Sequence, residues 1–597
     1  MNYKKWIIGL CILNILPALS QEYNIENIHI DGYIGNRINT CIEHRVKSQN
    51  TDHLIEPFKH RNEDHLWQSE FFGKWLLGAI ASYQYTKDKE LYNLITNSVE
   101  KLMNTQTSDG YIGNYKREAQ LTNWDIWGRK YTSLSLLSYY RLTGDKKALN
   151  AVERLINHLM EQLQIHNINI AATGYYLGMA SCSILEPVVY LYDITRNPRY
   201  LSFAKSIVSS IEREGSSQLI TKTLKNIPVS ERSAFPKSWW SFENGQKAYE
   251  MMSCYEGLIE LGTIVNDPFY IKIAEKAVNN IQEDEINIAG SGAAFECWYK
   301  GKEKQTLPTY HTMETCVTFT YMQLCHRLLC KTGNSFYAEE FEHTMYNALM
   351  ATMKNDGSQI SKYSPLEGRR QPGEEQCGMH INCYLNLYLP LQATISLNKK
   401  NKVHLNVESD YPIHGKVNVN IGVQKKEKFT LALRIPTQIE KMKAYINGEE
   451  QEITHKGGYL YIERIWENAD KVTLDFKIET KVVKLNNSQA IVRGPLLFAR
   501  DSRFNDGDID ECATIKCNNQ GVIQAKIKKN KTGTFPWITL TVPAVLGTDL
   551  ENVENKTPKL INFCDFSSSG NDWNPNGRYR VWIPQTFHAM SEPYKKY

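Results

Sequence analysis

A short phrase recurs five times between residues 85 and 338 and limits the folds that are open to this chain. It reads YTKDKELY, LTGDKKAL, ITRNPRYL, VNDPFYI and KTGNSFYA, with its Asp or Asn at positions 88, 145, 197, 267 and 334. An amphipathic helical pattern precedes each copy and another follows it, as residues 130–142 and 148–163 do around the second. We expect the Gly, Asn or Asp of the phrase to cap the first helix and form the turn. The sequence therefore predicts a helical hairpin that is repeated along the chain.

Repeated helical hairpins form either an open solenoid or a closed toroid. Tetratricopeptide and HEAT units have about 34 to 47 residues, whereas the Asp or Asn positions here differ by 57, 52, 70 and 67 residues. Loops rich in aromatic residues and glycine, such as QTSDGYIGNYK and FPKSWWSFENG, suit the mouth of a central cleft. We therefore predict an (α/α)6 toroid, a catalytic barrel over residues 64–385.

The apolar period changes to two from about Asn386 onward. Segments such as KVHLNVESDYP, KVNVNIGVQ and FTLALRIP alternate apolar and polar residues and are separated by Gly and Pro turns. This pattern predicts an antiparallel β-sandwich over residues 386–500. Residues 501–597 form a second, less regular β-rich region, and residues 21–63 supply a strand segment that packs on the sandwich or the barrel. The expected fold class is a multidomain α+β protein.

The first twenty residues have the pattern of a secretory signal peptide. Two lysines precede an apolar run, and Ala18-Leu19-Ser20 forms a small-x-small cleavage site. The apolar run is too short to span a bilayer comfortably, and no other uncharged stretch approaches the required ~20 residues. We expect an exported protein, periplasmic or extracellular, with no transmembrane segment.

The charge balance and the aromatic content bear on the partner. The formal charge is +4 over 597 residues, and no Lys- or Arg-rich run is interleaved with aromatic residues, which argues against nucleic acid. The chain has 34 Tyr, 12 Trp and 19 Phe. Most of these belong to the core, but Trp and Tyr also line sites for flat, amphipathic ligands such as sugars.

Three stretches concentrate reactive side chains. GSGAAFECWYKGK contains Glu296, HTMETCVTFTYMQLC contains Glu314 and Cys316, and EEQCGMHINCYLNLYLPLQ contains Cys383. A Glu-x-Cys pair alone is no zinc site, because structural zinc takes four ligands and catalytic zinc usually three. A cysteine such as Cys383 would have to complete it. The alternative is that Glu314 caps a helix while Cys316 packs in the core.

The stretches FECWYKGKEKQTLPTYHTMETC and KYSPLEGRRQPGEEQCGMHINC resemble glycoside hydrolase family 127, which includes the β-L-arabinofuranosidases. The resemblance implies an (α/α)6 barrel followed by β-sandwich domains, and a retaining reaction with a zinc-bound cysteine nucleophile. Matched residue by residue, Glu296 is the general acid/base, Glu314 and Cys316 are zinc ligands, and Cys383 is both nucleophile and zinc ligand. The thiolate attacks the anomeric carbon while the glutamate protonates the leaving oxygen.

The chain departs from the family pattern directly after Cys383. Family members have a second cysteine there, followed by a turn and a barrel helix, whereas this chain has Tyr384 and then the strand-like LNLYLPLQATISL. An apparent deletion therefore removes one of the four zinc ligands. Two hypotheses follow: an exo-glycosidase acting on pectic or arabinose-containing plant cell-wall glycans, or a catalytically impaired carbohydrate-binding paralogue.

Further residues are candidates for contacts with a glycan substrate. TNWDIWGRKY offers two indole rings and a carboxylate, SILEPVVYLY and KAYEMMSCYEG each place a carboxylate on an apolar helix, and a histidine flanks each cysteine motif. A lone buried charge needs a partner or a ligand. The candidates are Trp124, Asp125, Trp127, Glu186, Glu250, His311 and His380. A third hypothesis is an inverting enzyme or a lyase that uses Glu186 and Glu250 without any cysteine.

Overall fold

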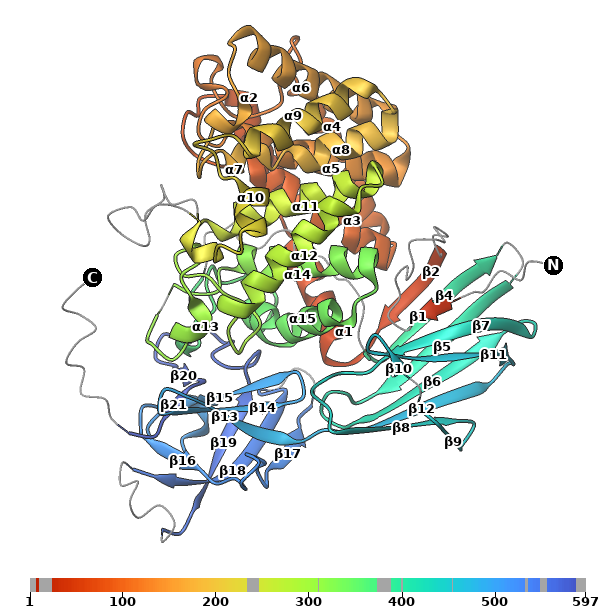
Figure 1. Ribbon diagram of the computed structural model, residues 1–597, viewed down its shortest axis with the longest axis vertical. Coiled ribbons are helices and arrows are strands. Elements are labelled where there is room, and N and C mark those ends of the chain that lie inside the picture. Colours follow the sequence, from red (N-terminus) through yellow and green to blue (C-terminus); the bar gives the residue numbers. More distant parts are fainter. Residues whose placement is uncertain are drawn as a thin grey trace.

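The computed structural model has three parts, a helical domain, a two-sheet β-sandwich and a C-terminal β-sheet (Figure 1). It describes residues 7–9, 24–232, 246–309, 311–372, 388–398, 401–453, 455–531, 535–547 and 556–586. The predicted architecture, a helical toroid followed by antiparallel sheets, is confirmed.

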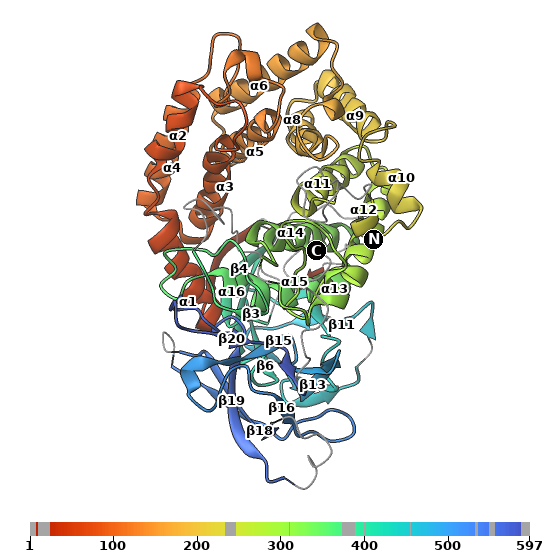
Figure 2. The ribbon, with the colours of Figure 1, turned by 90° about the vertical axis from the view of Figure 1, so that its left-hand side faces the viewer.

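In the described residues, five helices line the inside of the toroid, and each packs on the next along the chain; Figure 2 shows their arrangement around the ring. Most residues of these inner helices are buried around their whole circumference, because they have the centre of the ring on one side and outer helices on the other. They are α3 (Ser69–Thr86), α5 (Asp125–Thr143), α8 (Leu185–Thr195), α11 (Ala248–Ile264) and α14 (Thr315–Thr332).

Five amphipathic helices form the outer layer, and each follows an inner helix through the repeated phrase. The Asp or Asn of the phrase is the N-cap of the outer helix, and its side chain accepts a backbone N–H from the first turn. The expected role of the glycine is confirmed, since Gly144 and Gly333 of the phrase end the preceding inner helices in a left-handed conformation, whereas the Asp or Asn caps the outer helix and not the inner one. The outer helices are α4 (Lys89–Met103), α6 (Lys146–Ile165), α9 (Pro198–Ile211), α12 (Pro268–Asp284) and α15 (Ser335–Thr344).

Between α14 and α3 the ring is filled by the N-terminal helices. Ile34 and Ile38 of α1 share a core with Phe319 and Met322 of α14, and the π-helical turn η1 packs on α3. These and the remaining short helices are α1 (Gly32–Cys41), η1 (Ile42–Val46), α2 (Thr51–His60), η2 (Arg117–Ala119), η3 (Ile170–Ala172), α7 (Met179–Cys182), α10 (Leu219–Leu224), η4 (Val229–Glu231), α13 (Gly301–Lys304), η5 (Met345–Leu349), α16 (Met350–Thr352) and η6 (Ser502–Phe504).

The β-sandwich buries the alternating apolar residues of two sheets against each other. A seven-stranded sheet has the order β2 (Asn24–Ile30), β4 (Leu391–Asn398), β5 (Asn401–Ser409), β6 (Lys416–Val423), β12 (Asp470–Lys477), β8 (Lys441–Ile446) and β9 (Glu449–Gln451). The facing sheet has the order β1 (Ile7–Gly9), β7 (Glu427–Arg434), β11 (Tyr459–Trp466) and β10 (His455–Lys456). The N-terminal strand β2 thus pairs with β4, which follows the helical domain.

After the sandwich, the strands of the third sheet start at residue 480, whereas the boundary between the two β regions predicted from the sequence lies at residue 500. Strands β13 to β15 pair with the C-terminal strands and not with the sandwich, and the period of two in the sequence is the same in both sheets. The strands are β13 (Thr480–Leu485), β14 (Ser488–Arg493), β15 (Leu496–Asp501), β19 (Lys559–Asp565), β18 (Ile538–Leu546), β16 (Ala513–Ile515), β17 (Lys526–Lys529), β20 (Tyr579–Arg580), β21 (Ile583–Pro584) and β3 (Glu367–Gly368).

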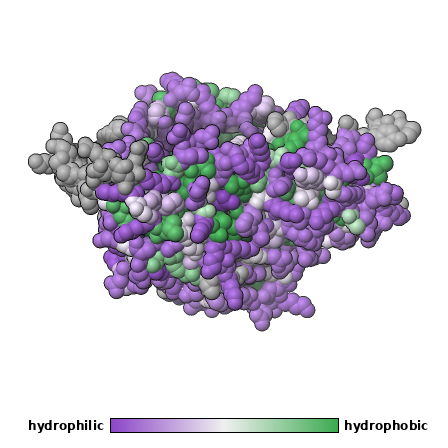
Figure 3. All heavy atoms as spheres, turned by 90° about the horizontal axis from the view of Figure 1, so that it is seen from below, coloured by the Kyte–Doolittle hydropathy of each residue, from purple (hydrophilic) through white to green (hydrophobic). Residues whose placement is uncertain are grey.

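The C-terminal sheet packs against the helical domain. Phe498 and Phe563 of this sheet share a core with Phe341 and Met345 of the last hairpin. The face formed by the β regions is mostly hydrophilic in Figure 3, with small separated hydrophobic areas. Among the residues that the structure describes, no helix is both long and apolar enough to cross a membrane.

Candidate active site

Polar side chains converge where the inner helices begin. Each inner helix follows an outer helix, so all inner helices start at the same end of the toroid. Glu70 lies in the first turn of α3, Glu250 in the first turn of α11, and Cys316 in the first turn of α14. All three side chains are less than 9% exposed. Residues far apart in the sequence therefore meet at one end of the ring.

A strained loop presents Glu296 to this end. Ala293, Phe295 and Glu296 have φ of +67°, +46° and +68°, a left-handed conformation that is uncommon for residues other than glycine and typical of functional sites. Backbone hydrogen bonds hold the loop, from Phe295 N to His311 O at 2.8 Å and from Ala294 N to Cys297 O at 2.9 Å. Phe295 stays 37% exposed and stacks on the His311 ring. The loop therefore keeps the carboxylate inside and an aromatic ring outside.

The Glu296 carboxylate lies between two lysines. It pairs with the Lys247 ammonium, and its other oxygen lies 3.5 Å from Lys362 Nζ and 3.5 Å from the Tyr363 hydroxyl that donates to it. Burial acts to raise the pKa of Glu296, but the charges of Lys247 and Lys362 outweigh it and hold this pKa below its usual range. Glu296 is therefore predominantly ionised near neutral pH.

Lys247 links several groups of the site. Its Nζ donates to the Tyr176 hydroxyl at 3.3 Å, lies 3.9 Å from Glu250 Oε1, and sits 4.7 Å from the centre of the Tyr176 ring. It also lies 6.0 Å from the Trp124 ring. The side chain is only 3% exposed. A buried ammonium with two carboxylate neighbours and an aromatic wall holds the surrounding groups in place.

Two carboxylates of the site have an oxygen that no described residue contacts with a hydrogen bond. Glu250 Oε2 and Glu314 Oε2 are both buried, and neither has a hydrogen-bond partner in the part of the chain that the structure describes. Burial raises the pKa of Glu250 to about 7, and it raises the pKa of Glu314 well above its usual range, with the Glu296 charge adding to the effect. Buried polar atoms are normally satisfied, so these two oxygens could accept a donor or a cation that a ligand supplies. We call Lys247, Glu250, Glu296 and Glu314 the Glu296 cluster.

Glu314 and Cys316 have the chemistry of metal ligands. Glu314 occupies the N-cap position of α14, but its side chain makes no capping hydrogen bond, which argues against the alternative that it caps the helix. Burial acts to lower the pKa of the nearby Lys74, yet the charges of Glu70, Cys316 and Glu314 raise it. A carboxylate oxygen and a thiolate are both zinc ligands. The donors therefore fit a zinc ion, and the described residues supply two of them.

Two candidates from the sequence lie outside the described residues. These are Cys383, the candidate nucleophile, and His380. Strand β4 begins at Leu391, so only residues 384–390 separate Cys383 from the sandwich.

The candidates of the TNWDIWGRKY segment separate into different roles. Trp124 packs edge-on against Trp127 and Tyr176, beside Lys247. Trp127 is 1% exposed and donates its indole N–H to Glu70. Asp125 accepts hydrogen bonds from Tyr111 Oη, Leu121 N and Arg129, at 2.7, 2.9 and 2.7 Å. Asp125 therefore holds the loop before α5, and only Trp124 adjoins the cluster.

Glu186 lies in a different cluster, deeper along the inner helices. Arg327 of α14 binds Glu186 of α8, at 2.5 Å, and Glu256 and Glu260 of α11, at 3.3 and 2.5 Å. The arginine also donates to the Tyr190 hydroxyl at 2.6 Å. We call these four charged residues the Arg327 cluster. They join three inner helices, which gives Glu186 a structural partner.

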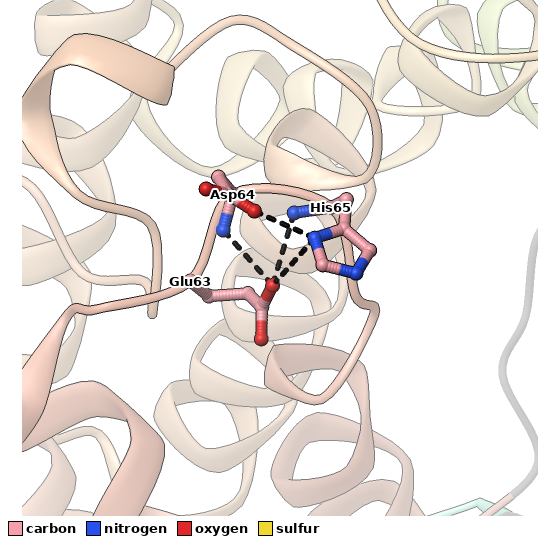
Figure 4. Close-up of side chains that lie close together, drawn as sticks. All are labelled: Glu63, Asp64 and His65. Atoms are coloured by element: carbon pink, nitrogen blue, oxygen red, sulfur yellow. Dashed lines mark hydrogen bonds and ion pairs between the residues drawn. The ribbon is translucent and has the colours of Figure 1, made fainter.

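A third acidic group lies in the loop before α3 (Figure 4). Ligand atoms of Glu63, Asp64 and His65 lie within 4.8 Å of one another. The Glu63 carboxylate already accepts backbone N–H groups from Asp64, His65 and Leu66, at 2.9 to 3.0 Å. The group is thus a hydrogen-bonded loop turn, which accounts for its geometry without a metal ion.

The lysines that pair with the carboxylates of the site were not among the residues predicted from the sequence. Lys247 and Lys362 neutralise Glu296, and Lys74 pairs with Glu70 at 2.9 Å. A charge on the otherwise apolar helix SEFFGKWLLGAIA is the same signal that indicated Glu186. Lys247 precedes Glu250 by three residues, a spacing that places two helical side chains together.

Two family models and one characterised relative match this chain. Residues 28–384 match the β-L-arabinofuranosidase GH127 catalytic domain, and residues 382–478 match the GH127 middle domain. The chain is 20% identical over 511 residues to a non-reducing end β-L-arabinofuranosidase of Bifidobacterium longum subsp. longum, which covers 73% of this chain and 76% of that protein.

Two solved structures share the fold of the whole chain. A GH127 β-L-arabinofuranosidase from Geobacillus stearothermophilus T6 aligns with a TM-score of 0.71 and 17% identity, over 94% of this chain and 100% of that one. A second GH127 β-arabinofuranosidase aligns with a TM-score of 0.71 and 19% identity, over 95% and 98% of the two chains.

Proposed function

This chain belongs to glycoside hydrolase family 127, and on that premise we propose that it is an exported retaining exo-glycosidase that removes L-arabinofuranose from plant cell-wall glycans. The observation that carries the proposal is the Glu296 cluster, in which two buried carboxylate oxygens have no partner among the described residues. A site built for a sugar and a cation leaves such oxygens open until both are bound.

Glu296 has the role of general acid/base in this proposal. The minor fraction of Glu296 that carries a proton donates it to the glycosidic oxygen as the bond to the anomeric carbon breaks, and the carboxylate that remains later takes a proton from the attacking water. Lys247 and Lys362 hold the carboxylate in position. Phe295 and His311 form a stacked pair directly beside Glu296, so they adjoin the leaving-group side of the bond. Trp124 and Glu250 are the proposed contacts to the sugar that is released.

The nucleophile is Cys383, an assignment that rests on the sequence motif. Its thiolate forms a bond to the anomeric carbon while the leaving group takes the proton of Glu296. Water then displaces the sulfur, and two inversions give overall retention. Glu314 and Cys316 would hold a zinc ion together with Cys383. Zinc would supply a deprotonated, oriented sulfur at neutral pH.

Zinc content tests this proposal first. We expect about one zinc ion per chain in the purified protein, since a catalytic site usually keeps three protein ligands. Cys316→Ser should lose the metal, whereas Cys325→Ser, on the same buried helix, should keep it. Hydrolysis of an aryl L-arabinofuranoside should follow the zinc content.

The second candidate function is a carbohydrate-binding paralogue without turnover. The feature that favours it is Tyr384 in the place of the second cysteine of the family. A protein that binds arabinose oligosaccharides but contains no zinc and hydrolyses none of them would support this candidate and contradict the glycosidase.

A further inference from the structure

A second polar hollow lies on the β-sandwich, apart from the toroid. It is a groove of about 450 Å³ on the outer face of the seven-stranded sheet. Four neighbouring strands, β2, β4, β5 and β6, form its floor, and the loop before β12 forms one wall. The lining side chains that point outward are Asn27, His29, Gln392, Thr394, His404, Asn406, Asn420 and Asn468.

Strand register arranges these side chains in two rows. The pairing places Asn27 opposite Thr394, Thr394 opposite His404, and His404 opposite Gly422. The second row runs through His29, Gln392, Asn406 and Asn420. Neighbouring strands lie about 4.8 Å apart, so each row crosses roughly 14 Å of the sheet. Gly422 carries no side chain, and a Cβ there would lie 3.3 Å from His404 Cβ. The glycine therefore keeps one end of the first row open.

Among the residues that the structure describes, no Asp, Glu, Lys or Arg lines the groove, although these residues make up 22% of the chain. The same outer face carries ordinary charged residues beyond the groove, such as Glu408, Lys443 and Lys471. An exposed sheet face is usually polar, but the described polar side chains that line the hollow are amides, a hydroxyl and imidazoles, whereas the rest of the face also carries charges. A neutral ligand with many hydroxyl groups matches this chemistry, and an anionic ligand does not.

Several of these groups are available to a ligand. Thr394 and His404 bond to each other at 3.0 Å, and Asn420 donates to the Asn406 carbonyl at 3.3 Å. The side chains of Gln392, Asn406 and Asn468 make no hydrogen bond within the part of the protein that the structure describes. Each amide offers a donor and an acceptor, which is what vicinal sugar hydroxyls require.

We propose that this groove binds a neutral glycan chain laid across the four strands, as a second carbohydrate site outside the toroid. The edge strand β2 leads directly into α1, and Ile30 N bonds to the Tyr85 hydroxyl of α3 at 3.2 Å (Figure 1). A polysaccharide held in the groove is thus tethered to the domain that carries Glu296. The proposal does not depend on the chemistry at Glu296.

Affinity electrophoresis of the full chain in native gels tests the groove. The gels contain arabinan, galactan or xylan as neutral probes, with polygalacturonate as the acidic comparison. We expect at least one neutral polysaccharide to retard the protein and Gln392→Ala/Asn406→Ala to lose most of that retardation. Gly422→Gln, which fills the hollow, should behave like the double variant. Lys443→Ala, on the same face outside the groove, should keep the retardation.

Thermal melting and hydrolysis of a small aryl glycoside serve as controls for correct folding. Both should be the same in the double variant and the original protein. Three outcomes would overturn the proposal. They are retardation by polygalacturonate alone, retardation of the double variant equal to that of the original protein, and no retardation by any neutral polysaccharide. So would a dimer in sedimentation that the groove variants dissociate, because the face would then be an interface between copies.

Discussion

The Glu296 cluster and the Arg327 cluster are both groups of buried charges on the inner helices, yet their hydrogen bonding differs. In the Arg327 cluster one guanidinium binds three carboxylates, and within the described part of the chain every buried polar atom of these four side chains has a partner. In the Glu296 cluster, Glu250 and Glu314 each keep an oxygen that no described residue satisfies. Burial of charge is therefore common to a structural and a candidate catalytic site. The unsatisfied oxygens distinguish the second.

The difference also appears in strain and position. The Glu296 loop holds three non-glycine residues at positive φ, whereas Glu186, Glu256 and Arg327 lie within regular helices. Strain that the surrounding structure has to maintain is typical of a functional site. A satisfied ion-pair network inside a ring holds helices together instead. The predictions below test this division of roles.

The largest expected effect is on activity, from Glu296→Gln. Removing the proton donor and acceptor should lower kcat/KM about 10²- to 10⁴-fold, with little change in melting temperature. Steady-state hydrolysis of an aryl L-arabinofuranoside measures the first quantity and calorimetry the second. Glu260→Gln, in the Arg327 cluster, serves as the control and should keep most activity. Equal losses in the two variants would erase the distinction between the clusters.

The next effect is on stability, from Arg327→Met. Three carboxylates would lose their common cation, so we expect unfolding to become easier by about 3 to 5 kcal/mol. The loss should be smaller at pH 5 than at pH 8, because protonated carboxyls need no cation. Chemical denaturation at both pH values measures it, and Arg327→Lys should recover part of the loss. An unchanged midpoint would show that the cluster does not hold the helices together.

A smaller effect, of opposite sign, is expected from Glu250→Gln. Burial raises the pKa of Glu250 to about 7, so the folded state binds this proton more tightly than the unfolded state does. The stabilisation that this bound proton provides is therefore complete at low pH and is lost as pH rises from about 4 to about 7. At pH 8 the amide should stabilise the protein by up to about 3 kcal/mol, and at pH 4 by almost nothing. Melting curves of both proteins across this pH range measure the effect. A difference in melting temperature that stayed constant with pH would contradict the prediction.

The smallest effect is a shift of the pH profile in Lys247→Gln. Without this ammonium the pKa of Glu296 should rise, so the protonated acid persists to higher pH and the alkaline limb of kcat/KM moves up by about 1 unit. The matched control is Lys130→Gln, a buried ammonium over the Trp127 ring. If both variants move the limb equally, the direct contact to Glu296 is not the cause.

Much of the fold was predictable because its signals are local. The Asp or Asn of each repeated phrase caps a helix with its own side chain, only two or three residues from its partner. Helical and strand periods are read within a single element. The boundary between the two β regions was not predictable in this way, since β13 to β15 have the same period as the sandwich strands. Long-range pairings assign them, such as that of β15 with β19, more than fifty residues away.

The amino-acid sequence by itself determined the family, the hairpin repeat and the motif that places Glu314 two residues before Cys316. Only the tertiary structure decided which buried charges are neutralised. Glu186 and Glu250 are alike in the sequence, each a carboxylate on an apolar helix. Arg327, 141 residues from Glu186 along the chain, satisfies the first, whereas Lys247 lies 3.9 Å from Glu250 Oε1 and leaves Oε2 without a partner among the described residues. Coulomb interactions depend on distance in space, so this difference is set by the packing of the inner helices.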